Sequence, residues 1–156
     1  MEVERINTIE QNKKLVEAFP FLLPRNRWTD EVVEDYDYTW TELDAMPEGW
    51  RKLFGEHMCA EIAAILKNAN YLDKYRIIQI KEKYGSLRWY GSGVPAEISE
   101  ELNTLIRFYE ILSERTCIVC GAPATRVTTG WISPYCDNCV SKDENSVPIK
   151  EWLEKR

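Results

Sequence analysis

Histidine is nearly absent from this chain of 156 residues, which contains a single one, His57. Catalytic arrangements that pair a nucleophile with an imidazole therefore have only one possible base. The sequence also has no glycine-rich nucleotide loop and no recognisable motif of paired catalytic carboxylates. These absences argue against an enzyme. A function as an enzyme that uses His57 or the many carboxylates is therefore the last of the three hypotheses given at the end of this subsection.

Excess positive charge and long apolar runs are lacking as well. The net charge is -6, so the molecule as a whole offers no general attraction to nucleic acid. The most apolar stretch, residues 19–23, is short and contains Pro20, so we expect no membrane span. The first five residues lack the features of a signal peptide, and cysteines paired as metal ligands suit a reducing compartment. We therefore expect a cytoplasmic protein.

Helical periodicity is the clearest structural signal in the chain. Apolar residues recur at three- and four-residue spacing at about 49–69 and again at 95–114, and this spacing predicts two long amphipathic helices. A polar helix is expected at 4–18, and a short one around residues 149–153.

Strand signals occur between the two long helices. Residues 77–84 and 87–90 have strand composition, and Gly85-Ser86 between them predicts a type II′ hairpin turn. Aromatic residues alternate with polar ones at 36–40, as in a short strand with one aromatic face. The sequence thus predicts an α+β fold, with two long helices packed on a small antiparallel sheet.

Four cysteines form two C-x-x-C pairs near the C-terminus, with fifteen residues between the pairs. This spacing is typical of a zinc site, because each turn directs two thiolates at one ion and a hairpin brings the pairs together. Four sulfurs leave no open position for water, so we expect a structural Zn²⁺ ion rather than a catalytic one. The predicted ligands are Cys117, Cys120, Cys136 and Cys139. We expect an α+β domain at residues 1–114, and a zinc ribbon with a short tail at 115–156 packed on it.

Two other chemistries fit these cysteines less well. Redox C-x-x-C motifs normally occur singly and open a helix after a strand. Zinc deaminases combine P-C-x-x-C with H-x-E. Here Tyr135 separates Pro134 from Cys136, and Cys59 occupies the place of the glutamate after His57, so neither half matches. Cys59 itself is expected to be a small buried apolar side chain.

Three pieces of the sequence are distinctive together. Gly49-Trp50 opens the first long helix, residues 81–90 read KEKYGSLRWY, and a C-x-x-C-G-x-P sequence begins at Cys117. In these pieces the chain resembles a family of uncharacterised bacterial and phage-borne proteins that join such a hairpin motif to a C-terminal zinc ribbon. The resemblance implies an architecture and a phage or mobile-element context, and it implies no activity.

Residues 28–48 carry eight acidic residues and no Lys or Arg. The segment is interpreted as a solvated surface, as a divalent-metal site, or as a contact surface for a basic protein. In the third case, the acidic side chains of the segment would imitate the charge of nucleic acid. A calcium loop is disfavoured because the ligand pattern of such loops is missing. The candidate partner-binding residues are Asp30, Glu31, Glu34, Asp35, Tyr36, Asp37 and Tyr38.

Residues 74–90 carry the opposite charge, with five basic residues and one acid. The cations could meet phosphates while the aromatic rings stack on bases. Alternatively, the cations cover core aromatics or pair with the acidic segment of the same molecule. The candidate nucleic-acid-binding residues are Lys81, Lys83, Arg88, Trp89 and Arg126.

These observations order the three hypotheses. The first is a non-enzymatic, zinc-stabilised protein-binding factor, such as an inhibitor or regulator of a host complex. The second is a nucleic-acid-binding protein that uses the basic hairpin and the ribbon, and the third is the enzyme considered above.

Overall fold

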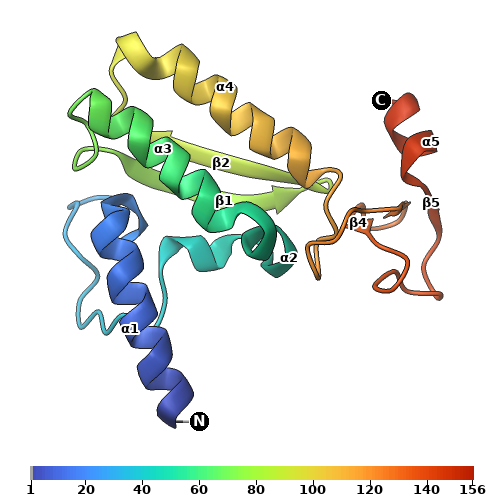
Figure 1. Cartoon of the computed structure of the whole chain (residues 1–156), viewed down its shortest axis with the longest axis horizontal. Coiled ribbons are helices and arrows are strands. Elements are labelled where there is room, and N and C mark those ends of the chain that lie inside the picture. The colour runs from blue at the N-terminus through green and yellow to red at the C-terminus, as the bar shows by residue number, and fades with distance from the viewer. Residues whose placement is uncertain (1) are drawn as a thin grey trace.

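Two long helices and a two-stranded antiparallel sheet form the larger part of the molecule (Figure 1). The computed structural model describes residues 2–156. Strand β1 (Arg76–Lys83) pairs with β2 (Ser86–Ser92). Helix α4 (Ala96–Ser113) packs against β2 and against α3 (Glu56–Asn68). The predicted α+β class is confirmed.

Other elements surround this unit. Helix α1 and two 3₁₀ turns precede it, and three short strands and a last helix follow it, with β3 between β4 and β5. Their bounds are α1 Glu2–Ala18, η1 Pro20–Leu22, η2 Glu42–Ala45, β3 Arg126–Thr128, β4 Pro134–Tyr135, β5 Ser146–Pro148 and α5 Ile149–Glu154. The predicted polar helix and the short C-terminal helix are both present.

The core forms where the apolar stripes of the helices meet the inner face of the hairpin. Ile62 and Leu66 of α3 are fully buried, as is Leu87 of β2. Burying one such side chain stabilises the fold by about 1.5–3 kcal/mol. Trp89 is also in this core, where its indole N–H donates to the hydroxyl of Tyr75 at 2.9 Å. This hydrogen bond satisfies a polar group that would otherwise be buried without a partner.

The helix predicted at 49–69 contains a π-helical turn. It begins with α2 (Glu48–Trp50), continues as the π segment η3 (Arg51–Gly55) and ends as α3. A π-turn contains one more residue than an α-turn, and such turns are frequent at functional sites. The apolar spacing predicted the extent of the helix and gave no sign of this extra residue.

The hairpin turn lies one residue earlier than predicted. Lys83 pairs with Ser86, so the two turn residues are Tyr84 and Gly85, whose φ angles are +54° and +78°. Two positive φ values indicate a type I′ turn, and the predicted type II′ turn at Gly85-Ser86 is wrong. The Glu82 carboxylate accepts the Gly85 N–H at 2.8 Å and stabilises the turn. A left-handed tyrosine costs about 1–2 kcal/mol, and Tyr84 is 69% exposed, so burial does not offset this cost.

The strand predicted at 36–40 is absent, and the segment is irregular, with a bend at residues 38–39. Tyr38 has a φ of +62°, and the Asp37 carboxylate accepts the hydroxyl and the N–H of Thr39. Such local side-chain hydrogen bonds compete with strand pairing. The aromatic rings gather nevertheless, because the Tyr36 ring lies 4.7 Å from that of Tyr38 and 6.1 Å from that of Trp40.

The ribbon, residues 115–156, follows α4 in the chain. It also packs against the start of the first long helix. The Gly49 N–H donates to the Ile118 carbonyl at 2.9 Å, and the Trp50 indole N–H donates to the Thr116 carbonyl at 2.9 Å. Gly121, with φ +84°, lies against Gly49, where a side chain would collide. The division at residue 114 stays a prediction, while the contacts between the two parts are close.

Candidate metal centre and binding surfaces

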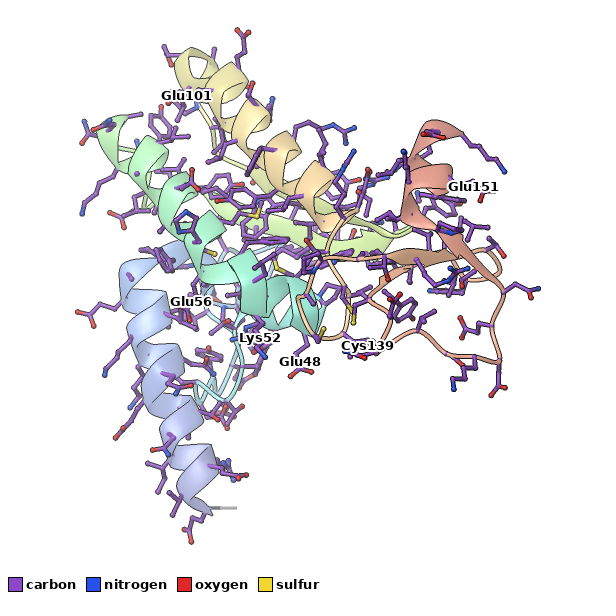
Figure 2. The ribbon with its side chains drawn as sticks, turned by 45° about the vertical axis from the view of Figure 1, so that its right-hand side comes forward. Glu48, Lys52, Glu56, Glu101, Cys139 and Glu151 are labelled. Atoms are coloured by element: carbon purple, nitrogen blue, oxygen red, sulfur yellow. The ribbon has the colours of Figure 1, made fainter. Side chains whose placement is uncertain are left out.

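The four predicted ligands come together in the ribbon. The Sγ atoms of Cys117, Cys120, Cys136 and Cys139 all lie within 4.8 Å of one another. The Cys120 and Cys136 sulfurs are 3.7 Å apart. This agrees with the distance of about 3.8 Å between two sulfurs that bind one tetrahedral ion through Zn–S bonds of about 2.3 Å. Figure 2 shows Cys139 on the side of the ribbon near Glu48, at the start of α2. The cluster is therefore a site that can hold a metal ion.

Backbone hydrogen bonds close each C-x-x-C turn. The Cys117 N–H donates to the Ala122 carbonyl at 2.7 Å, and the Gly121 N–H donates back to the Cys117 carbonyl at 3.0 Å. In the second pair, the Cys139 N–H donates to the Cys136 carbonyl at 3.2 Å. The turns direct both sulfurs of each pair toward one point.

The pKa values of the thiols favour a bound cation at this point. Burial raises the pKa of the Cys117 thiol, but backbone N–H groups that donate to its sulfur outweigh this effect and lower the pKa to about 7. Hydrogen bonding with Cys136, together with burial and the other sulfurs, raises the pKa of Cys139 to about 12. Cys117 thus loses its proton more readily than Cys139. A bound dication would supply the charge that four thiolates need.

Two of the candidate acids are engaged inside the molecule. Asp30 binds the Arg76 guanidinium through both carboxylate oxygens, at 2.7 and 3.2 Å, and this contact lowers its pKa. Asp37 accepts hydrogen bonds from Thr39, which lower its pKa, and lies 3.6 Å from Arg5. The acidic and basic segments therefore meet at Asp30 and Arg76, as one of the alternatives predicted.

The other five candidate partner-binding residues are two tyrosines that pack within the segment and three acids without an ion pair. The Tyr36 hydroxyl donates to the Trp40 carbonyl, and the carbonyl of Tyr38 accepts the Asn12 amide of α1 at 2.8 Å. The carboxylates are exposed and form no ion pair among the residues that the structure describes. They are Glu31, Glu34 and Asp35.

Sequence reasoning missed Trp28, whose side chain is 96% exposed. Trp28 stands at the tip of the Trp28 loop, residues 25–32, whose ends join in a β-bridge. The Asn26 side chain accepts the N–H groups of Trp28 and Thr29 at 2.8 and 3.1 Å, and the Asn26 N–H donates to the Glu31 carbonyl at 2.8 Å. The turn-forming Asn26 two residues before a tryptophan was the available signal.

Two of the five candidate nucleic-acid-binding residues are unsuited to that role. Trp89 is only 3% exposed, so the prediction that its ring stacks on a base is wrong. Arg126 donates to the Ser146 hydroxyl at 2.7 Å and to its carbonyl at 2.9 Å, and it joins β3 to β5. Its guanidinium is therefore committed to the fold of the ribbon.

The remaining three candidates lie on the outer face of the hairpin. Lys81 pairs with Arg88 across the strands, and period-two alternation places Lys83 on the same face. Arg88 is held by the Ser86 hydroxyl at 3.0 Å. Lys81 and Lys83 form no ion pair within residues 2–156.

His57 lies at the rim of an open cavity of about 1140 Å³ beside the π segment. Its Nε2 atom is 3.1 Å from Glu61, which also accepts the hydroxyl of Tyr109. Cys59 is fully buried, as expected, and desolvation raises the pKa of its thiol. It is therefore not available as a nucleophile for His57.

No helix within residues 2–156 combines the length and the apolar character needed to cross a membrane. Comparisons with protein-family models, with curated proteins and with solved structures give no match.

Proposed function

We propose that this protein is a non-enzymatic, metal-stabilised protein-binding factor whose contact surface is centred on the Trp28 loop. The observation that supports this most strongly is an almost fully exposed tryptophan on a loop closed by its own hydrogen bonds. Tryptophan is enriched at binding hot spots, because its ring buries a large area when a partner covers it. A loop that is already ordered loses little conformational entropy on binding.

The charges around the loop favour a basic partner. Glu31, Glu34 and Asp35 follow Trp28 within seven residues and are exposed, and Val32 adds apolar surface between them. They outnumber the one exposed cation of the loop, Arg27, so the surface is acidic on balance. Carboxylates at the rim of an interface mainly accelerate association with a cationic protein. In the phage or mobile-element setting that the sequence resemblance implies, the partner would be a host complex that this protein inhibits or regulates.

Zinc is the metal proposed for the cysteine cluster. Four thiolates at tetrahedral spacing suit Zn²⁺ and close its coordination sphere, so the ion would be structural. It would hold the two C-x-x-C turns against Gly49 and Trp50. Thiolate ligands also fit a reducing compartment such as the cytoplasm.

Replacing Trp28 with alanine should strongly reduce partner capture. A tagged pull-down from the native host, followed by mass spectrometry, identifies the partner, and purified components then give the affinity. Loss of a central tryptophan should weaken binding by roughly 30-fold, since hot-spot truncations cost about 2 kcal/mol or more. Trp131→Ala is the matched control, because that ring is similarly exposed and lies elsewhere.

The proposal has two distinct ways to fail. Equal capture by the Trp28→Ala variant and the wild type would exclude the loop as the contact. Co-purification that disappears after nuclease treatment would instead favour the nucleic-acid hypothesis.

A further inference from the structure

The turn of the β1–β2 hairpin meets the ribbon (Figure 1). Two more exposed aromatic rings lie at this junction. Tyr84 is 69% exposed and Trp131 is 77% exposed, and both line one cavity of about 320 Å³. Arg76, which binds the Trp28 loop, begins β1, and Tyr84 follows its end, so roughly 25 Å of strand separates the two surfaces.

Backbone contacts fix the relative positions of the two turns that carry these rings. The Gly85 backbone packs against the ribbon loop, residues 129–132, so closely that a Cβ there would lie 3.2 Å from Ile132 Cγ2. The ribbon loop is closed by Thr128, whose N–H donates to the Ser133 carbonyl at 3.1 Å and whose hydroxyl accepts the Ser133 N–H at 3.0 Å. The two turns are therefore held together, and we call the rings that they carry the aromatic platform (Tyr84 and Trp131).

Tyr84 is strained in a way that the fold does not require. Its φ of +54° is disfavoured for a bulky residue, and asparagine is the common choice at this turn position. Backbone strain in an exposed residue is a reason to look for a binding role. The side chain gains no burial that would explain its presence.

The charges beside the platform are positive on balance. Lys83 Nζ lies 5.7 Å from the centre of the Tyr84 ring, and Lys81 extends from the same face of β1. Glu82 also lines the cavity and keeps its charge while it accepts the Gly85 N–H, whereas Glu114 is paired with Arg156 at 2.7 Å. A polyanion therefore meets cations on this side of the molecule.

We propose that the aromatic platform binds single-stranded nucleic acid, with bases stacked on Tyr84 and Trp131 and phosphates against Lys83 and Lys81. Rings carried on projecting turns can reach unpaired bases, whereas the bases of a duplex are already stacked on one another. The net charge of -6 should keep the affinity low and confine binding to this patch. The site shares no residue with the Trp28 loop, so either proposal can fail while the other stands.

Fluorescence anisotropy with labelled oligo(dT) and oligo(U) of 12 nucleotides tests the platform on the full-length, metal-loaded protein at low salt. Trp131→Ala should lower the affinity roughly tenfold or more, because a stacked base contributes strongly to single-strand binding. Neutralising two phosphates predicts a slope of about -1.4 for log K against log salt, at about -0.7 per phosphate. Trp28→Ala should bind like the wild type, and a duplex of the same length should bind more weakly.

Tyr84→Asn separates binding from folding. Asparagine suits the turn, so the thermal midpoint of this variant should equal or exceed that of the wild type, while its oligonucleotide affinity falls at least tenfold. The proposal is overturned if the wild type binds neither oligonucleotide at low salt, or if Tyr84→Asn and Trp131→Ala both bind normally. Preferred binding of a proline-rich peptide, which also docks on aromatic grooves, would overturn it as well.

Discussion

Replacing Gly49 with alanine should destabilise the protein by about 3 kcal/mol or more, at the upper end of the range for overpacking. A Cβ at this position would lie 2.7 Å from the Ile118 carbonyl carbon and closer still to the Cys117 carbonyl oxygen. Both obstacles are backbone, and the Gly49 N–H is bonded to Ile118, so neither segment can retreat without losing that bond. Urea or thermal unfolding of the two proteins measures the effect.

Gly130→Ala is the matched control for this substitution. Nothing lies within 4 Å of a Cβ added at Gly130, so its stability should change by less than about 0.5 kcal/mol. Equal unfolding midpoints for the Gly49→Ala variant and the wild type would show that the ribbon does not dock on the first long helix as described.

Removing the metal, or removing one of its ligands by the substitution Cys136→Ser, should unfold the ribbon. The α+β domain should stay folded. Apparent binding energies of structural zinc sites are about 10–16 kcal/mol at neutral pH, which exceeds what short strands such as β3 to β5 supply alone. Hydrogen exchange should show lost protection in residues 117–148 and retained protection in α3 and α4. Metal analysis should find one Zn²⁺ per wild-type chain and none in the variant.

Acidification should release the same metal, because protons compete for the thiolates as the pH falls. Cys59→Ala is the control, since this cysteine is buried in the core away from the cluster and should leave the metal content unchanged. Full zinc occupancy in the Cys136→Ser variant, or unchanged exchange after chelation, would contradict a structural four-sulfur site.

The parts of the fold that depend on local periodicity could be predicted from the sequence. The apolar spacing near Ile62 and Leu66 identified the helix that contributes them to the core, and the two C-x-x-C pairs identified the sulfurs that converge. Both patterns work because the residues involved are near one another in the chain, so backbone geometry alone places them on one face or in one turn.

Features that depend on competing local bonds or on distant contacts could not be predicted. The strand composition of 36–40 was outweighed by the Asp37–Thr39 hydrogen bonds. A tryptophan in a basic hairpin is equally consistent with a binding surface and with a core, and only distant contacts such as those of Trp89 with Phe21 and Tyr75 decide for the core. Trp28 became visible as a surface residue only once the loop that carries it was placed.

The π segment has a consequence for how the two parts of the molecule fit together. Each residue of a regular helix advances the chain by about 100° around the axis. The extra residue in Arg51–Gly55 takes up that rotation, so Gly49 can face Cys117 while Ile62 faces the core. Wound as a regular helix, the same residues would turn Gly49 away from the ribbon by about that angle. The angular phase of one helix thus determines where the ribbon with its four cysteines sits.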